Sequence, residues 1–329
     1  MADSQKRKAK ILYLMKIFLE ETDEEHGLTM PQLIKKLEAY GITANRKTIY
    51  SDIAELSDFG IDIIGEKIGR EYIYHAVGRT FELAELKLLV DSVQAAKFIS
   101  EKKSRKLIKK LGELASRHEA KQLTRQVLIA GRVKTMNESV YYGVDKLHQA
   151  INDDRQITFR YFQWNMDKEP ELRHGGKLYK ASPWSLIWDD EYYYLVAFDE
   201  DDKRIKHYRV DKMLEIEQTE EPRAGREEFG SFNVSTYSKQ LFGMFGGEVR
   251  KVTLECRKEA AGIIIDRFGK DVIMQKIDDE HFICVVDVAI SKQFEGWLFS
   301  LAGIIKITAP ADVADAVKND ALRFASGEE

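Results

Sequence analysis

Cysteine and proline are both scarce, with two cysteines and five prolines among 329 residues. Cys256 and Cys284 each lie in an apolar run, VTLEC and FICVV, of the kind that forms a buried strand. Two buried thiols fit the role of small core side chains better than that of a disulfide, and free thiols persist in reducing compartments. The sequence therefore predicts a cytoplasmic protein that is held together by its hydrophobic cores.

Long hydrophobic runs are missing too, since no stretch approaches the ~18 to 20 apolar residues that span a bilayer. The N-terminal run ILYLMKIFL follows a basic cluster, as in a signal peptide. However, Lys16 interrupts the run, and Glu20 and Glu21 stand where small residues would precede a cleavage site. We interpret the segment as a helix of the folded protein and expect no membrane partner.

The sequence lacks the usual catalytic motifs: G-x-S-x-G, G-x-x-x-x-G-K-[ST] and H-x-x-x-H do not occur. The seven histidines are scattered, and no two share metal-ligand spacing with a cysteine. The acidic runs Asp189–Asp190 and Asp199–Asp202 fall in expected turns, where solvated loop charge is commoner than acid–base catalysis. We therefore predict a protein that is not an enzyme and that needs no metal or cofactor.

Length and net charge restrict the number of domains and the class of partner less strongly. A chain of 329 residues is long for one core and predicts two to four domains. The formal net charge of -4 does not exclude nucleic acid, because a binding protein needs only a local basic face.

Residues 1–78 show three helical patterns followed by two short strands, which predicts a winged helix-turn-helix domain. Thr29 and Gln32 form a capping-box pattern before the second helix, and the third helix turns Ile49, Ile53 and Leu56 inward. The residues expected to face the DNA major groove, or the adjacent backbone from the wing tip, are Arg46, Lys47, Thr48, Tyr50, Ser51 and Arg70. The alternative is an ordinary solvated helix face.

Residues 79–140 are helical in pattern almost throughout and form a predicted linker. Their most basic stretch comprises Lys102, Lys103, Arg105, Lys106, Lys109, Lys110, Arg117, Lys121 and Arg125. Two interpretations stay open for it: a solvated helical face, or a supplementary contact with DNA phosphates.

Residues 141–222 predict a small barrel. Ile157–Tyr161 has the alternation of a first strand, and Gly175–Gly176 predicts a tight turn. The runs Tyr192–Phe198 and Ile205–Met213 flank a polar turn and predict a hairpin. Because strand side chains alternate, Tyr194, His207 and Arg209 are expected on the face opposite the core.

The end of the chain predicts a separate α/β domain. Residues 223–247 read as a connector without sustained periodicity, and residues 248–329 follow the order βαββαβα. That order predicts a ferredoxin-like α/β sandwich, so the whole chain is of the α+β multidomain class.

The hairpin carries a family resemblance: Tyr193-Tyr194-Leu195 followed by Lys206-His207-Tyr208-Arg209-Val210-Asp211-Lys212-Met213 resembles the signature of the WYL domain. Tyr193 stands where the family usually has Trp, and Lys206 and Lys212 stand where Arg is common. The run KTIYSDIAEL is similar to the recognition helix of the winged-helix domains that precede WYL domains, and FEGWLFSLAGIIKITAP is similar to the WCX-type C-terminal extension.

The resemblance implies a bacterial, ligand-responsive, DNA-binding transcriptional regulator with a Sm-like WYL barrel. It also implies that the barrel senses a nucleotide, an oligonucleotide or another anionic effector. The candidate ligand-binding residues are Arg160, Ser185, Tyr194, His207 and Arg209. The alternative for Arg160, Tyr194, His207 and Arg209 is a structural role, as strand residues that pair with nearby carboxylates such as Asp211. We expect double-stranded DNA and a second copy of the chain, forming a homodimer, as partners. The alternative function is an RNA- or single-strand-binding accessory protein without operator specificity.

Overall fold

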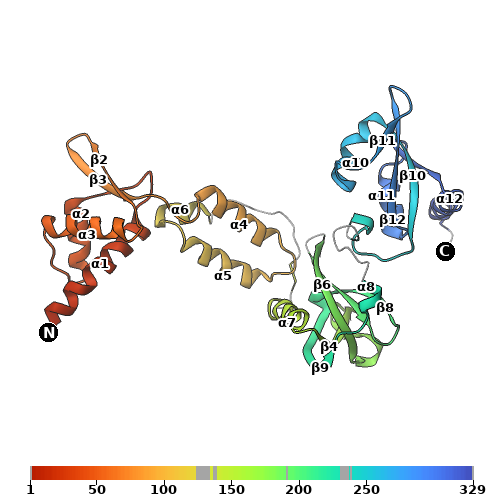
Figure 1. The fold of residues 1–329 in the computed structure, drawn as a ribbon, viewed down its shortest axis with the longest axis horizontal. Coiled ribbons are helices and arrows are strands. Elements are labelled where there is room, and N and C mark those ends of the chain that lie inside the picture. The colour runs from red at the N-terminus through yellow and green to blue at the C-terminus, as the bar shows by residue number, and fades with distance from the viewer. Residues whose placement is uncertain are drawn as a thin grey trace. The chain divides into compact units, whose positions relative to one another are not determined.

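The computed structural model describes residues 2–123, 134–135, 139–189, 192–229, 237 and 239–327. The chain divides into two compact units, residues 1–138 and 139–329, and each is considered by itself. Both units combine helices with antiparallel sheets, which confirms the α+β class (Figure 1).

The first unit begins with a winged helix. Its elements are α1 (Ala2–Glu21), β1 (Leu28–Thr29), α2 (Met30–Ala39), α3 (Arg46–Asp58), β2 (Ile63–Ile68) and β3 (Glu71–Ala76). The three strands form one sheet in the order β1-β3-β2, and β2 and β3 make the wing. Side chains start the helices as the sequence predicts: Gln32 accepts a hydrogen bond from the Thr29 amide at 2.7 Å, and Asn45 accepts one from the Thr48 amide at 3.0 Å.

The helices of the winged helix pack around one apolar core. Ile49 and Leu56 of α3 are buried in it, and Ile53 packs against it. The face that α3 turns inward is therefore the predicted one. Beside this core the carboxylate of Asp52, in the middle of α3, pairs with Lys10 Nζ of α1 at 2.7 Å, so an ion pair also joins the two helices.

Three further helices of the first unit follow the wing: α4 (Leu83–Ala95), α5 (Glu101–Gly112) and α6 (Arg117–Leu123). They pack around Leu86, Val90 and Leu123, with Ile108 and Leu111 of α5 against them. Lys134 connects α4 to α5, because its ammonium donates to Val93 O at 3.1 Å and to Ser104 Oγ at 2.7 Å. The rest of the predicted helical linker, from residue 124 to 140, lies largely outside the described residues.

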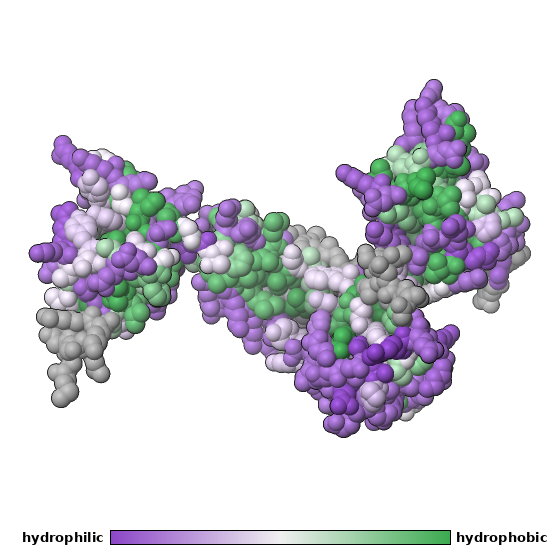
Figure 2. Space-filling view, in the orientation of Figure 1, coloured by the Kyte–Doolittle hydropathy of each residue, from purple (hydrophilic) through white to green (hydrophobic). Residues whose placement is uncertain are grey.

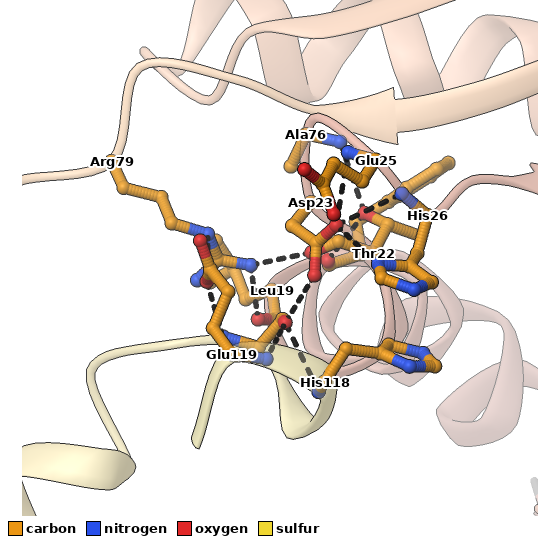
Figure 3. Close-up of polar contacts among 11 residues, drawn as sticks. Leu19, Thr22, Asp23, Glu25, His26, Ala76, Arg79, His118 and Glu119 are labelled. Atoms are coloured by element: carbon orange, nitrogen blue, oxygen red, sulfur yellow. Dashed lines mark hydrogen bonds and ion pairs between the residues drawn. The ribbon is translucent and has the colours of Figure 1, made fainter. Parts of the chain in front are cut away.

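The bundle is joined to the winged helix by a polar junction at the end of α1 (Figure 3). The buried Asp23 carboxylate accepts hydrogen bonds from the Ser116 hydroxyl and from the His26 amide, the latter at 2.8 Å. Arg79 donates to the carbonyls of Leu19 and Thr22 at 2.7 and 2.6 Å. Because both sides of the junction are hydrogen-bonded and largely buried, the bundle is a continuation of the winged helix.

The second unit starts with α7 (Val140–Asn152) and a six-stranded sheet. Its strands are β4 (Arg155–Trp164), β5 (Pro170–Leu172), β6 (Tyr179–Asp189), β7 (Tyr192–Asp199), β8 (Arg204–Arg209) and β9 (Met213–Pro222). The order is β5-β4-β6-β7-β8, and β9 pairs with β4. The predicted β7–β8 hairpin is present, with Tyr194 opposite Arg209.

The sheet differs from the expectation in one respect. The sequence predicts a strand as far as Met213, but the chain leaves the sheet at Val210–Lys212 in a 3-10 turn and re-enters it as β9. No ladder joins β8 to β9 within the described residues, so the sheet is a curled half-barrel and not a closed barrel. Strand β9 ends at Pro222, directly before the predicted connector, and its mixed polar sequence hides its alternation.

The C-terminal part contains β10 (Val249–Arg257), α10 (Ala261–Phe268), β11 (Met274–Lys276), β12 (His281–Ala289), α11 (Lys292–Ser300), β13 (Ile305–Ala309) and α12 (Ala311–Ser326). Its antiparallel sheet has the order β11-β12-β10-β13. Cys256 and Cys284 are free and buried in this core, as predicted. Within the described residues, no helix has the length and hydrophobicity required to cross a membrane.

Candidate nucleic-acid interface and ligand cavity

The first candidate site is the outer face of α3. Arg46, Lys47 and Ser51 are exposed, and Tyr50 has 39% of its surface exposed. Thr48 is half-buried because it lies in the first turn, where its hydroxyl donates to the Asn45 carbonyl at 3.0 Å. The structure therefore brings the predicted α3 residues together on one solvated surface, with Thr48 at its edge.

A chain of hydrogen bonds orients Arg46 on this face. Its Nε donates to the Tyr50 hydroxyl at 3.0 Å, and the Tyr74 hydroxyl, from β3, donates to the same oxygen at 3.0 Å. The hydrogen bonds from Tyr74 and Arg46 lower the pKa of Tyr50, whereas burial raises the pKa of Tyr74 to about 12. The two Nη nitrogens of Arg46 form no hydrogen bond or ion pair within the described residues. The guanidinium is thus held in place with its bidentate edge available to guanine or phosphate.

Arg70 lies at the tip of the wing. It is exposed and follows Gly69, whose φ of +64° makes the turn between β2 and β3. Glycine adopts this backbone region more readily than residues that carry a Cβ. The wing tip consequently presents a cation at the end of a two-stranded ribbon, apart from the α3 residues.

The second candidate site is a cavity of about 920 Å³ in the second unit. Its lining includes Tyr194, His207 and Arg209 from the hairpin and residues 243–248, all but the last of which belong to the connector. The charged residues of the lining are Arg173, Arg204, Lys206, Arg209, Lys212 and Glu248. Arg204, Lys206 and Arg209 are paired with carboxylates beside the cavity, so its net positive charge comes from Arg173 and Lys212. That charge favours an anionic ligand.

Arg209 is the most constrained of these cations. Its Nε and Nη2 donate to the two carboxylate oxygens of Asp211 at 3.1 and 2.8 Å, and its guanidinium lies 3.6 Å from the centre of the Tyr192 ring. Burial lowers the pKa of Arg209, but the Asp211 contact outweighs it and leaves the pKa raised. The side chain has an ion-pair role within the fold as well as a place in the cavity wall.

Arg173 and Lys212 differ from Arg209 because neither has an ion-pair partner within the described part of the chain. Burial, together with the neighbouring charge of Arg209, lowers the pKa of Lys212. Such a shift marks a place where positive charge is incompletely compensated, and an entering anion would compensate it. Lys212 stands in the hairpin motif and Arg173 precedes the predicted Gly175–Gly176 turn, so both were visible in the sequence, although no pattern connected them.

His207 is bound by the connector. Its Nε2 lies 3.0 Å from the Tyr237 hydroxyl, and burial lowers its pKa to about 4 despite a hydrogen bond to the Met244 backbone. It is therefore neutral near pH 7 and contributes no charge to the cavity. Sequence reasoning missed Tyr237, because nothing in an aperiodic connector marks a residue that folds back on a strand.

The connector also covers the rest of this hairpin face. Val196 and Phe198 are buried against Phe229, Leu241 and Met244, so the face predicted to bind a ligand is partly a second core. Gly225 permits the approach: it has a φ of +79°, and a Cβ there would lie 2.4 Å from Phe198 Cγ.

Two predicted ligand residues lie outside the cavity lining. Arg160 donates to Glu215 Oε2 at 2.8 Å and to the Gly176 carbonyl, which anchors β4 to the following turn. Ser185 is half-buried at an irregularity of β6 opposite Val196. The cavity thus unites Tyr194, His207 and Arg209 but not Arg160 or Ser185.

The acidic turn 199–202 has a structural role that its sequence does not indicate. Asp199 is 1% exposed and accepts hydrogen bonds from the Tyr208 hydroxyl and from the Asp202 amide, the latter at 2.8 Å. Lys206 Nζ lies 3.1 Å from the same carboxylate and 2.5 Å from that of Asp202. The charge of Lys206 is therefore largely neutralised within the hairpin.

The chain matches three domain families: the WYL domain over residues 144–218, the WCX domain over residues 248–325, and the FokI D3 domain over residues 5–67. A search of curated proteins finds no match. None of the three matches is to a family of catalytic domains.

Two solved structures are similar to the chain at low identity. Proteasome accessory factor B/C (PafBC) of Arthrobacter aurescens is 17% identical with a TM-score of 0.25, and the match covers 95% of this chain and 46% of that chain. A CRISPR Cas-related protein is 13% identical with a TM-score of 0.36, and the match covers 89% and 77% of the two chains. The chain thus spans less than half of the PafBC chain. A winged helix, a WYL domain and a WCX domain thus follow one another along this chain, which confirms the resemblance to WYL-domain transcriptional regulators.

Proposed function

We propose that the protein is a ligand-responsive transcriptional regulator that reads duplex DNA with the outer face of α3. The observation that carries the proposal is the division of α3 into a buried face with Ile49 and Leu56 and an exposed face with Arg46 and Lys47. Arg and Lys pair with guanine or phosphate, and Ser51 can accept or donate beside them. Arg70 at the wing tip contacts the neighbouring backbone.

The effector is an anion of the nucleotide or oligonucleotide class, bound in the cavity of the half-barrel. Arg173 and Lys212 supply uncompensated charge, and Tyr194 supplies a ring and a hydroxyl for a base or sugar. Binding regulates DNA affinity only if the ligand prefers one of two states of the protein, and a coupling of about 1 to 3 kcal/mol is typical.

The proposed assembly is a homodimer, because two winged helices can read two half-sites about 34 Å, one helical turn, apart or a multiple of that distance. The proposed domains are the winged helix (1–78), the helical linker (79–140), a WYL sensor with a Sm-like barrel (141–222), the connector (223–247) and a WCX domain (248–329). The strand order of the last supports a ferredoxin-like sandwich. A monomer in light scattering, both free and on DNA, would contradict the dimer.

The test is selection of bound duplexes from a random pool with the full chain. The wild type should enrich one sequence, and Arg46→Ala with Lys47→Ala and Tyr50→Ala should lose the enrichment at a cost of about 1 to 3 kcal/mol for each good base contact. Lys270→Ala, at an exposed lysine of the C-terminal domain, is the control and should bind as the wild type does. Uniform retention of RNA or single strands, with no duplex selected, would favour the accessory-protein alternative.

A further inference from the structure

Helix α5 carries a charge that the proposed function does not use. Its sequence EKKSRKLIKKLG contains six lysines and arginines and one glutamate, in a chain whose net charge is -4. At ~100° per residue, the six cations occupy an arc of about 160° on one side of the helix. Figure 2 shows hydrophilic residues along the lower edge of the bundle, where α5 lies, and hydrophobic residues above them.

The opposite side of α5 packs inside the helical bundle. Ile108 and Leu111 pack against the core of the bundle, and Ser104 is buried. An amphipathic helix that lies in a membrane surface needs its apolar side free, so this arrangement excludes that occupant. The basic side is exposed at Lys106, Lys109 and Lys110.

These three lysines repel one another without compensation inside the unit. Lys106 is three and four residues from Lys109 and Lys110, spacings at which like charges destabilise a helix. No carboxylate pairs with any of the three within the described residues, whereas Arg105 lies 3.6 Å from Glu101. A polyanion would relieve this repulsion.

The residue types favour duplex phosphates over exposed bases. Lysine ammonium groups are point charges that bind phosphate without reading sequence. Binding of single strands relies on aromatic rings on which bases stack, and α5 has none. From Lys102 to Lys110 the helix rises ~12 Å, which matches the axial length of about three phosphates of one DNA strand.

The bundle is also fastened to the domain that carries α3. The Ser116 hydroxyl donates to the Asp23 carboxylate, and Arg117 Nη2 lies 2.9 Å from the Glu20 carboxylate; Ser116 and Arg117 both follow the C-terminal end of α5. We propose that the basic side of α5 is a second, sequence-independent DNA contact, which binds backbone phosphates flanking the site read by α3. This inference rests on the proposed DNA-binding function and adds a surface to it.

The test measures the affinity of the wild-type chain and of one triple variant, with Lys106→Gln, Lys109→Gln and Lys110→Gln together, for a duplex selected from the random pool. Affinity should fall for all sequences alike, and the sequence preference should remain. Because each lost phosphate contact removes about 0.9 from the salt slope, raising salt from ~50 to ~200 mM should weaken the variant about 40-fold less than the wild type. Shortening the duplex to the α3 site should remove this difference.

Two controls separate charge from structure. The corresponding arginine variant, Lys106→Arg, Lys109→Arg, Lys110→Arg, should keep the wild-type salt slope. So should Lys251→Gln, Lys270→Gln, Lys318→Gln, which removes the same charge from exposed positions of the C-terminal domain.

An unchanged slope in the α5 glutamine variant, with selective binding intact, would overturn the inference and leave an acidic protein as the partner to seek. A reduced slope in the arginine variant would also overturn it. If the wild type itself selects no duplex, the proposed function fails instead.

Discussion

Removing the buried carboxylate of Asp199 should destabilise the half-barrel more than any single change on its surface. The Tyr208 hydroxyl, the amides of Asp201 and Asp202, and Lys206 all contact this carboxylate. In Asp199→Ala, the hydroxyl of Tyr208, a residue 6% exposed, is left buried without its acceptor. Breaking a buried polar or ionic pair typically costs ~3 to 5 kcal/mol, and we expect that loss in the free energy of unfolding.

Two further variants separate the contributions to this loss in the free energy of unfolding. Asp199→Asn keeps the shape and one acceptor, so the loss should be about 1.5 to 3 kcal/mol, the usual contribution of a hydrogen bond to a charged group. Tyr208→Phe removes the donor as well, so adding it to Asp199→Asn should cost less than the sum of the two single changes by ~0.5 to 3 kcal/mol.

Urea denaturation followed by tryptophan fluorescence suits this measurement, because Trp164, Trp184 and Trp188 lie in the sheet and only Trp297 lies outside it. A Trp297→Phe background assigns the transition to the half-barrel. Asp201→Ala in the same turn is the control: its exposed pair with Lys177 is of a kind that contributes ~0 to 1 kcal/mol. If Asp199→Ala costs no more than this control, the carboxylate does not have the structural role assigned to it.

Three other outcomes are expected. Arg173→Gln with Lys212→Gln should lose binding of pyrophosphate and short oligonucleotides in calorimetry while keeping wild-type stability, and wild-type binding in this variant would refute the cavity site. Arg209→Ala should lose stability, because the Asp211 carboxylate, in a residue 8% exposed, loses its ion pair with the guanidinium. Burial lowers the folded-state pKa of His207 to about 4, so as the pH falls the imidazole becomes protonated in the unfolded chain before it does in the folded one. The free energy of unfolding should therefore fall by up to ~3 kcal/mol between about pH 6.5 and about pH 4. A His207→Gln variant with the same pH profile would contradict this. Ser116→Ala should speed hydrogen exchange in α6 by the equivalent of ~1 to 3 kcal/mol and leave exchange of the α3 amides unchanged. If α6 exchanges at the same rate in the variant and the wild type, the hydrogen bond to Asp23 does not hold the junction together.

Local chemistry allowed the elements of the first unit to be predicted from the sequence. Gln32 and Asn45 start their helices through contacts within three residues, and the spacing of Ile49, Ile53 and Leu56 defines the inner face of α3. Such signals depend on neighbours along the chain, so they survive without knowledge of the tertiary structure.

Only the tertiary structure decided which segments cover which faces. Strand alternation predicts that Tyr194, His207 and Arg209 share a side of the hairpin, but not that Tyr237 and Met244 of an aperiodic connector fold over it. Alternation likewise assigns Arg160 to a polar side without revealing that Glu215 and the Gly176 carbonyl occupy it. Period-2 and period-3.6 patterns record the burial of an element, whereas the identity of its covering partner depends on contacts between residues far apart in sequence. The sequence by itself thus determined the order of domains and the residues available to each site, and the folding of the connector onto the half-barrel determined which of them line the cavity.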